Sequence, residues 1–442
     1  MTNSNAKNFS QLCKMKFKII FSLLSFLVFT HETFSQPGCR YYDGYVLKGN
    51  LHLNDSVSLP IYFQLNLGAE PNIVMWNAEE KIKIEDVRIT NDSVNFSMPV
   101  FNSEFHCTWC KQDSPNSCAL KGFWINHNRT TKNIIPFDAT KINSVLASTE
   151  YWRMQVLAKA FKGKWETTFS PPPADSANTY KSIGVFRTGD CVNALFGTFL
   201  TETGDYRYLM GNADVKNGDT TMQLSCFDGS HAFVFTAKKN KDGTISGDFY
   251  SGKHWHEPFI AKRNENFELQ NPDSLTYLKP GFTKVDFSFP DTYGRKISLS
   301  DAQFKNKVVI IQIMGSWCPN CMDETKFLET LYKKYHTQGL EIVALAFEKT
   351  DDSLMALNNV VRFKTILQAD YNFLLTGDVG KDEASAAIPM LNEVMAFPTT
   401  IFIDKKGNVR KISTGFSGPG TGIYFDKYAE QTNLFVQQML GE

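Results

Sequence analysis

Two cysteines separated by two residues, Cys318 and Cys321, stand where a buried strand gives way to a helix. The run "VVIIQIM" ahead of them is apolar, and "CMDETKFLETLYKKY" repeats apolar residues at helical spacing. Free backbone N–H groups and the helix dipole stabilise a thiolate at the start of a helix. Pro319 suits the first turn, because its missing N–H costs no hydrogen bond there. We therefore expect Cys318 to be an exposed nucleophile that attacks a disulfide, and Cys321, better shielded, to resolve the mixed disulfide.

Two other uses of this cysteine pair compete with redox chemistry. A zinc site needs four ligands, and "HCTWC" (His106 to Cys110) would have to fold against the helix from a separate domain to supply them. A structural disulfide between positions i and i+3 at a helix start would be strained and easily reduced. Paired cysteines within a strand–helix pattern therefore favour redox chemistry.

The elements around the pair predict an α/β domain over residues 282–442. "NKVVIIQIMG" and "LEIVALAFE" are typical of short buried strands, and a helical pattern follows each. "PTTIFIDKKGNVRKISTGF" predicts a hairpin, and "YFDKYAEQTNLFVQQML" a closing helix. Alternating strands and helices indicate an α/β layer, with the hairpin as its antiparallel edge. Residues 264–281, polar and with two prolines, are expected to be a linker.

Residues 41–263 follow a different pattern, in which short alternating runs are bounded by Asn, Asp and Gly. Many short strands at even spacing predict an all-β antiparallel domain of the barrel or sandwich kind. A more helical stretch, 143–161, interrupts them. "LKGFWINH" before this stretch loosely resembles "ISGDFYSGKH" after it, which suggests two related halves, 41–142 and 162–263.

Residues 1–36 are expected to be a cleaved export signal. Lysines precede the apolar run "IIFSLLSFLVF", which is too short to cross a hydrocarbon core of roughly 30 Å as a helix. Export predicts a place in the periplasm or cell envelope, where thiols tend to be oxidised. In a minority alternative, Cys39 carries a lipid that anchors the protein to a membrane. Besides Cys318 and Cys321, the exported chain has six cysteines whose pairing the sequence leaves open: Cys39, Cys107, Cys110, Cys118, Cys191 and Cys226.

Composition limits the classes of partner. Lys+Arg and Asp+Glu both number 46, so the formal net charge is zero, and no basic stripe stands out. This balance argues against nucleic acid as the main partner. A hydrophobic content of 42% in 442 residues is ample for cores in two or three domains.

"SWCPNC" after a buried strand, with "FPT" (Phe397 to Thr399) before the hairpin, resembles thioredoxin-like proteins, and most of all the TlpA-like thiol-disulfide oxidoreductases of the cell envelope. The resemblance covers roughly residues 282–440. It implies a thioredoxin fold with no metal or organic cofactor, and a cis peptide bond before Pro398, which faces the cysteine pair. It also implies that an extended substrate meets a groove formed by Trp317, Pro319, Asn320, Phe397 and Pro398.

The same resemblance assigns Glu324 as a buried acid that tunes the thiols and relays a proton at Cys321. The alternative for Glu324 is a solvated glutamate in the first helical turn, favoured by the dipole. Residues 370–396 correspond to a strand and helix that these relatives insert before the cis-proline. Two positions depart from the family: Gln312 replaces a buried Asp of thioredoxins, and Lys326 replaces a helix-kinking proline.

"CTWC" (Cys107 to Cys110), with Cys118 nearby, is a candidate second redox centre. It lies in a β-rich region with no helix after it, so nothing stabilises a thiolate there. A structural disulfide is therefore preferred. Cys191 and Cys226 are expected either to pair or to remain buried thiols.

His254 and His256 stand two apart and would share one face of a strand. A metal would need a third ligand, and none is obvious, so surface or rim histidines are preferred. The aromatic runs "HAFVFT", "FGTF" and "GDFY" are expected to fill a barrel core rather than bind a cofactor.

We expect an exported thiol-disulfide oxidoreductase that exchanges disulfides with protein substrates, with a mild preference for a reducing role such as cytochrome c maturation. Its electrons would come from a membrane or envelope thiol protein, and the β-rich region has no assigned task. One rival is a thiol peroxidase, although Gly315 stands three residues before Cys318, where peroxiredoxins carry Thr. The other rival is a non-enzymatic envelope module that binds a ligand or partner.

Overall fold

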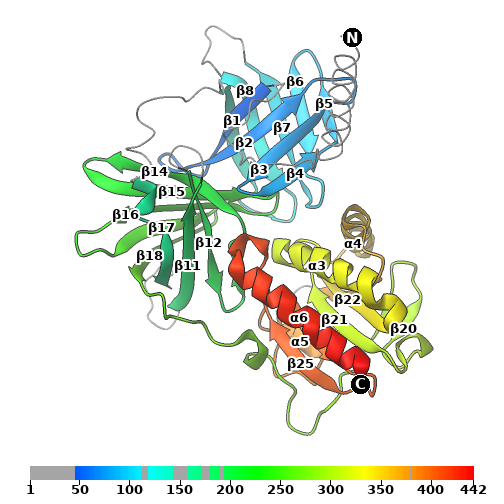
Figure 1. Cartoon of the computed structure of the whole chain (residues 1–442). Coiled ribbons are helices and arrows are strands. Elements are labelled where there is room, and N and C mark those ends of the chain that lie inside the picture. The colour runs from blue at the N-terminus through cyan, green and yellow to red at the C-terminus, as the bar shows by residue number, and fades with distance from the viewer. Residues whose placement is uncertain (1–44, 111–117, 143–156, 171–178, 190–193, 379–380) are drawn as a thin grey trace, which may run out of the picture. The chain divides into compact units, whose positions relative to one another are not determined.

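The computed structural model describes residues 45–110, 118–142, 157–170, 179–189, 194–378 and 381–442, which belong to one compact unit, Pro37–Glu442 (Figure 1). The predicted export signal, Cys39, Cys191 and most of the helical stretch 143–161 lie outside the described residues. Within those ranges, no helix is both long and apolar enough to cross a membrane.

The first part of the chain is one nine-stranded antiparallel sheet in the order β4-β3-β2-β1-β9-β8-β7-β6-β5. β1 and β9, the first and last strands along the chain, pair with each other in the middle of the sheet. The two edge strands are therefore β4 and β5. Every second residue of β2 is buried, as expected for a strand with one face on a core. The strands are β1 (Tyr45–His52), β2 (Ser58–Asn66), β3 (Asn72–Asn77), β4 (Glu80–Ile84), β5 (Val87–Ile89), β6 (Ser93–Ser97), β7 (Ser103–Trp109), β8 (Cys118–Asn126) and β9 (Ile134–Lys141).

The second part is another nine-stranded antiparallel sheet, and it closes on itself. β10 pairs with both β11 and β18, and a further pairing of β11 with β12 completes the ring. We call this closed sheet the barrel. Its strands are β10 (Gly163–Phe169), β11 (Tyr180–Thr188), β12 (Ala194–Thr201), β13 (Gly204–Asp205), β14 (Leu209–Lys216), β15 (Asp219–Phe227), β16 (Ala232–Lys239), β17 (Ile245–Ser251) and β18 (Trp255–Arg263).

Aromatic side chains fill the barrel. Phe235 lies between Phe199 and Phe249, with ring centroids 4.7 and 4.5 Å away, and all three are buried. Offset contacts of this kind add to the free energy of burial. The expectation of an antiparallel β region of the barrel or sandwich kind is confirmed, with a closed barrel in its second part only, and the aromatic runs fill the core of that barrel.

The two similar sequences, "LKGFWINH" and "ISGDFYSGKH", lie in corresponding strands of the two sheets. Gly122 lies in β8 and Gly247 in β17, and each of these strands is the last but one of its sheet along the chain. A Cβ atom at Gly122 would lie 1.9 Å from the His106 carbonyl oxygen, and one at Gly247 would lie 2.1 Å from that of Thr236. Each sheet thus requires glycine at this strand because the neighbouring backbone comes too close for a side chain.

The C-terminal part is an α/β layer with a five-stranded sheet in the order β23-β22-β21-β24-β25. The first three are parallel, and β24 and β25 form the predicted antiparallel hairpin. Its elements are β21 (Val308–Met314), α3 (Pro319–Tyr335), β22 (Leu340–Glu348), α4 (Ser353–Leu367), β23 (Asn372–Asp378), α5 (Lys381–Ala387), β24 (Thr399–Ile403), β25 (Val409–Thr414) and α6 (Ile423–Gly441). Short elements complete it: β19 (Ser288–Pro290), β20 (Lys296–Ser298), η2 (Pro272–Ser274), η3 (Ala302–Phe304), η4 (His336–Gln338) and η5 (Pro419–Thr421).

Strand β21 is buried along its whole length, as its apolar run predicts. Ile310 faces a core shared with α3, α4 and α6, and Ile311 faces a second core that includes Ala384 of α5. Helices therefore cover both faces of the sheet. The segment predicted as a linker is tied to this layer, since Thr276 N–H donates to the Thr414 hydroxyl at 3.2 Å.

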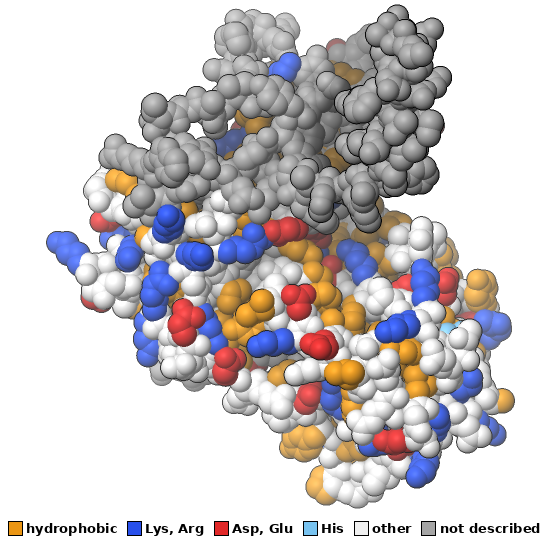
Figure 2. All heavy atoms as spheres, in the orientation of Figure 1, with side chains coloured by type: hydrophobic (Ala, Val, Ile, Leu, Met, Phe, Trp, Pro, Cys, Tyr) orange, Lys and Arg blue, Asp and Glu red, His pale blue; other side chains and the backbone are white. Residues whose placement is uncertain are grey.

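Basic and acidic side chains are interspersed over the described part of the face seen in Figure 2, in keeping with 46 residues of each sign. The fold thus carries the paired cysteines on a rigid α/β layer, with antiparallel β structure before it in the chain.

Candidate active site

Cys318 is the N-cap residue of α3, as the sequence predicts. Its Sγ accepts a hydrogen bond from the Cys321 N–H at 3.2 Å, and its own N–H donates to the Gly315 carbonyl at 3.1 Å. Pro319 is the first residue of the helix. The turn after β21 therefore holds the Cys318 sulfur over the first backbone donors of α3.

The predicted exposure of Cys318 is wrong. The residue is only 6% exposed, and Cys321 is fully buried. Cys318 opens into a cleft of about 270 Å³, whose far wall is not part of the α/β layer but of the barrel. The lining residues are Trp317, Cys318, Pro319, Asn320 and Phe397 on one side, and Thr201, Thr203, Gly204, Asp205, Tyr206, His231 and Phe233 on the other. The sequence pattern around Cys318 gave no sign that a second domain covers it.

The peptide bond between Phe397 and Pro398 is cis, as the resemblance implies. The Phe397 carbonyl lies 3.4 Å from the Cys318 Sγ and accepts its hydrogen bond. The Pro398 carbonyl accepts from Gly415 N–H at 2.8 Å. The loop before β24 therefore lies directly against the Cys318 sulfur.

Glu324 is fully buried below the cysteine pair, which excludes the alternative of a solvated first-turn glutamate. Its two carboxylate oxygens accept hydrogen bonds from the Thr400 hydroxyl at 2.6 Å and from the Gln312 side-chain amide at 2.9 Å. Burial raises the pKa of Glu324 to about 7, because the charged form loses its hydration. A carboxyl group with this pKa gains and loses protons readily near neutral pH.

Cys321 shares the environment of Glu324. Burial raises the pKa of the Cys321 thiol well above its ordinary value, and the neighbouring Cys318 and Glu324 raise it further. The thiol of Cys321 therefore needs a nearby base before it can attack.

Gln312, the departure from thioredoxins, has a definite place. Its amide nitrogen donates to Glu324 and lies 3.3 Å from the Cys321 carbonyl oxygen, while its own oxygen accepts from the Thr325 hydroxyl at 3.1 Å. A lone amide in the middle of an apolar strand was the sequence signal, because such a buried group must find partners. We conclude that Gln312 orients Glu324.

Trp317 both packs and shields. Its indole N–H donates to the Phe347 carbonyl at 2.9 Å, and its ring meets that of Phe397 edge-on at 5.6 Å. The Lys349 ammonium lies 3.6 Å from the centre of the indole ring. These contacts fix the aromatic wall beside Cys318.

A second buried carboxyl group lies at the same turn and was not predicted. Glu348, the last residue of β22, accepts hydrogen bonds from the Ser316 N–H at 2.8 Å and the Ser316 hydroxyl at 2.6 Å. Burial raises the pKa of Glu348 to about 7. A charged residue at the end of the apolar run that follows Glu341 in β22 was its only sequence signal. Glu348 fixes the turn that carries Trp317 and Cys318.

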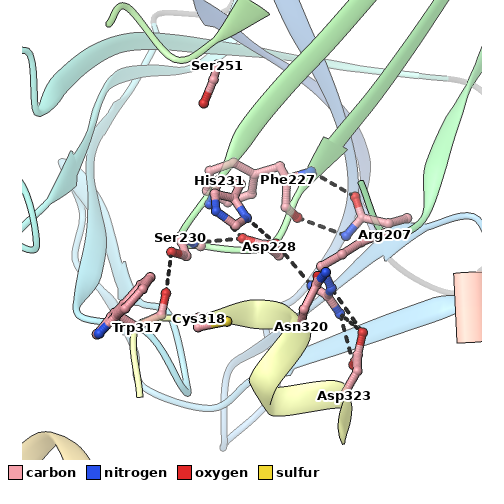
Figure 3. A network of polar contacts seen from close by, with 12 residues as sticks. Arg207, Phe227, Asp228, Ser230, His231, Ser251, Trp317, Cys318, Asn320 and Asp323 are labelled. Carbon is pink, nitrogen blue, oxygen red and sulfur yellow. Dashed lines mark hydrogen bonds and ion pairs between the residues drawn. The ribbon is translucent and has the colours of Figure 1, made fainter. Parts of the chain in front are cut away.

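The barrel is joined to α3 by a buried arginine (Figure 3). Arg207 is 1% exposed and donates to both oxygens of Asp323, at 3.1 and 3.2 Å, and to Asp228 at 3.0 Å. It also binds Glu80 of the first sheet. Burial alone would lower the pKa of Arg207, but the three carboxylates raise it well above its ordinary value. Sequence reasoning missed this cluster because Glu80 and Asp323 lie 127 and 116 residues from Arg207 along the chain.

Asn320, predicted to line the groove, bonds the barrel directly. Its side-chain amide donates to the Asp205 carbonyl at 3.1 Å, and an Asp205 carboxylate oxygen accepts from the Gly418 N–H at 2.6 Å. The short strand β13 is therefore held against the loop that follows β25.

The other cysteines differ from this pair. Cys110 forms a disulfide with Cys118, so the expected structural disulfide exists, and Cys107 stays a buried free thiol. Burial raises the pKa of Cys107 to about 12. Cys226 is also a buried free thiol. In the ranges covered by the structure, no group of three His, Cys, Asp or Glu side chains is placed to hold a metal.

The two histidines singled out by their spacing are not on one strand face. His256 lies in β18, is exposed and contacts Asp248 at 2.9 Å. His254 lies in the turn before β18, where burial and nearby cationic groups lower its pKa to about 4.

A cysteine pair at the start of a helix, facing a cis-proline loop on a five-stranded α/β layer, defines a thioredoxin-fold thiol-disulfide oxidoreductase. Comparison with known proteins agrees. Residues 281–412 match the AhpC/TSA family. The thiol-disulfide oxidoreductase ResA of Bacillus thuringiensis subsp. konkukian is 36% identical over 132 residues, which cover 30% of this chain and 68% of that protein.

The ResA protein of Bacillus subtilis is 30% identical over 138 residues, covering 31% of this chain and 69% of its own. The chain therefore belongs to the family of ResA-like thiol-disulfide oxidoreductases. Among solved structures, a thioredoxin-family thiol:disulfide interchange protein from Chlorobium tepidum aligns over 36% of this chain and 95% of its own, with 20% identity and a TM-score of 0.28.

Proposed function

We propose that this protein is a cell-envelope thiol-disulfide oxidoreductase that works through Cys318 and Cys321 on protein substrates. The observation that carries the proposal is the position of the Cys318 sulfur, which accepts the Cys321 N–H in the first turn of α3 and lies against the Phe397 carbonyl. In the first step the Cys318 thiolate attacks one sulfur of a substrate disulfide, forms a mixed disulfide and releases a substrate thiolate. In the second, Cys321, once deprotonated, attacks the Cys318 sulfur, forms the Cys318–Cys321 disulfide and releases the other substrate sulfur as a thiolate.

Glu324 is the proposed base of the second step. The Cys321 thiol must lose a proton to attack, and its pKa is raised by burial. The carboxylate of Glu324 takes that proton, for which a pKa of about 7 is well matched. Gln312 and Thr400 hold the carboxyl group for this role.

Trp317, Pro319, Asn320, Phe397 and Pro398 are the proposed substrate groove. The resemblance to envelope proteins favours export, with 1–36 as signal, 264–281 as connection and 282–442 as the redox domain. It also favours a reducing direction, with electrons supplied by a membrane or envelope thiol protein and substrates that include apoproteins of cytochrome c maturation. Anchoring through a lipid on Cys39 is the alternative for membrane contact.

A thiol peroxidase is the second candidate, because the matching AhpC/TSA family covers residues 281–412. Peroxide reduction requires a cysteine whose environment activates it toward the O–O bond. Gly315 stands where peroxiredoxins carry the Thr that assists this step. The sequence around Cys318 therefore favours disulfide exchange.

The deciding experiment compares two substrates with the purified chain. We expect insulin disulfide reduction in the presence of a dithiol donor, with hydrogen peroxide consumption no faster than that of free thiols. Cys321→Ser should accumulate a mixed disulfide at Cys318, detectable by mass spectrometry. Rapid peroxide turnover without insulin reduction would reverse the assignment. Equilibration with glutathione then gives the potential, and hence the direction.

A further inference from the structure

One side chain of the barrel faces the same cleft as Cys318 and has no part in the chemistry described so far. His231 stands in the turn between β15 and β16, with its ring stacked on Phe233 at 4.4 Å. It lines the cleft together with Cys318 and Trp317. The side chain is 29% exposed, so a molecule in the cleft can reach it.

The turn that carries His231 is rigid. One carboxylate oxygen of Asp228 accepts hydrogen bonds from the N–H groups of Ser230, at 2.8 Å, and of His231, at 2.7 Å. The Ser230 hydroxyl donates to the Trp317 carbonyl at 2.9 Å. Neighbours of His231 and Cys318 in the chain are therefore bonded to each other, which fixes the two side chains in one cleft (Figure 3).

The imidazole is oriented by a charged partner. Its Nδ1 lies 3.4 Å from the second oxygen of Asp228, an ion-pair distance rather than a formed hydrogen bond. Burial alone would raise the pKa of Asp228, but His231 and Arg207 lower it overall, so this carboxyl group is ionised. Over the parts of the chain that are described, no hydrogen bond to Nε2 of His231 occurs. A carboxylate on one ring nitrogen with the other ring nitrogen unbonded is the arrangement of an acid–base histidine.

The barrel is held over the cysteine pair by the same carboxylate. Arg207 binds Asp228 on one side and both oxygens of Asp323 on the other, and Asp323 lies two residues after Cys321 in α3. The position of His231 relative to the cysteine pair is thus tied to a buried ion-pair cluster. Such clusters fix geometry because each member, left alone, would be an unpaired buried charge.

We propose that His231 is a catalytic acid–base residue of the exchange at Cys318, supplied by the barrel and positioned by Asp228, Arg207 and Asp323. The inference rests on the proposed function and gives the barrel its task. When the Cys318 thiolate attacks a disulfide R–S–S–R′, the Cys318–S–R bond forms and R′–S⁻ leaves. The imidazolium gives its proton to R′–S⁻, which departs as R′–SH and leaves neutral imidazole. In the reverse direction, the imidazole takes the proton of the incoming thiol.

Several titratable groups lie around this imidazole and contribute to the pH dependence of the rate. Asp228 lies on its own turn, Asp205 lines the cleft from β13, and Cys318 lies across the cleft. His254 comes from the turn between β17 and β18 and interacts electrostatically with it. Asp228 lies 3.4 Å from the Nδ1 atom of His231.

The test compares His231→Gln with His256→Gln, an exposed histidine of the same barrel that does not line the cleft. We expect the single-turnover rate of disulfide reduction by the reduced chain to fall roughly 10- to 100-fold in H231Q, at the low end of general acid catalysis because thiolates leave readily. In the wild type the rate should fall at high pH, because the imidazole no longer carries the proton that it donates. This fall should be absent in H231Q and present in H256Q. Free imidazole should restore part of the rate of His231→Ala. Equal rates in the two Gln variants, or an H231A variant that imidazole leaves unchanged, would overturn the proposal.

A second variant tests the positioning cluster. Asp323→Asn keeps a hydrogen-bonding group at α3 but removes the charge that ties Arg207 to it. We expect faster alkylation of Cys318 by iodoacetamide, and a smaller effect of H231Q in the D323N background than in the wild type. An undiminished effect of H231Q there would show that Asp323 does not position His231. Cys318→Ser distinguishes a failure of the inference about His231 from a failure of the proposed function. If that variant still exchanges disulfides, the proposed function itself is wrong, whatever His231 does.

Discussion

The chain contains the Cys-x-x-Cys spacing twice, and the two copies behave differently. Cys107 and Cys110 lie at the end of a strand, where Cys110 pairs with Cys118 across a hairpin and Cys107 points into an apolar core. Cys318 and Cys321 lie at a helix start, where the first sulfur accepts the N–H of the second. Identical spacing therefore gives a fixed cross-link in one place and two adjacent free thiols in the other.

The difference comes from the surrounding elements. A strand points residues i and i+3 to opposite faces, whereas the first turn of a helix brings them together. Burial alone raises the pKa of Cys107, while Cys321 also feels Cys318 and Glu324. In the proposed mechanism, redox chemistry needs the helix start and the buried carboxyl group as well as the cysteines.

The largest expected effect separates the two pairs directly. Cys318→Ser should lower insulin reduction by three orders of magnitude or more, roughly the loss expected when a covalent nucleophile is removed. The double variant Cys110→Ser, Cys118→Ser should keep at least half of the activity, because that disulfide lies away from the cleft. Comparable losses in both would mean that the two pairs exchange with each other, and the contrast between them would not hold.

Glu324→Gln should have a smaller effect, because it removes the base and leaves both thiols. We expect a roughly 10- to 100-fold slower release of the mixed disulfide, within the range of general base catalysis. In the wild type this step should speed up as pH rises through about 7, where Glu324 ionises, and the variant should lack that rise. Stopped-flow measurement of the rate of the Cys321-dependent step between pH 5 and 9, in the wild type and in Glu324→Gln, tests this expectation. A rise retained in the variant would assign the ionisation to another group.

The same substitution should change how stability depends on pH. The pKa of Glu324 is raised from 4.5 to about 7 on folding, so its contribution to stability is greatest below pH 4.5 and declines as pH rises toward 7. The loss amounts to at most roughly 3 kcal/mol. Urea unfolding at pH 8 should find Glu324→Gln as stable as the wild type or more so. This prediction would be contradicted if Glu324→Gln lost as much free energy of unfolding between pH 5 and pH 8 as the wild type does.

The smallest effect is expected at Cys107, which lies in an apolar core and which we expect to take no part in exchange. Cys107→Ser should lower the free energy of unfolding by roughly 1–2 kcal/mol, since a hydroxyl would be buried there without a partner. Cys107→Ala is the matched control and should cost less. Both should reduce insulin at the wild-type rate, and a slower rate in either would give this thiol a redox role.

Local patterns predicted the redox domain well. The apolar run of β21, the helical spacing of α3 and Pro319 at the helix start each depend on neighbours in the chain, and together they located Cys318 and Cys321. The antiparallel character of the β region followed from alternation in the same way. Its division into one open and one closed sheet did not, because closure of the barrel requires β10 to pair with β18, the first and last of its strands along the chain.

The wall of the cleft could not be predicted. Arg207 and Asp323 are separated by 116 positions, and each read alone is an ordinary charged residue. Only the folded chain reveals that Arg207 is buried. For the same reason His231 carried no signal, since the sequence contains eight histidines and nothing local distinguishes this one.

Arg207 also bears on how the molecule comes apart under heat. Its guanidinium is shared by Glu80, Asp228 and Asp323, which come from the first sheet, the barrel and the redox domain. If the barrel unfolded before the other regions, Glu80 and Asp323 would lose Arg207 as their counter-ion, and a buried carboxylate without a counter-ion costs several kcal/mol. We therefore expect that the barrel does not unfold ahead of the first sheet and the redox domain.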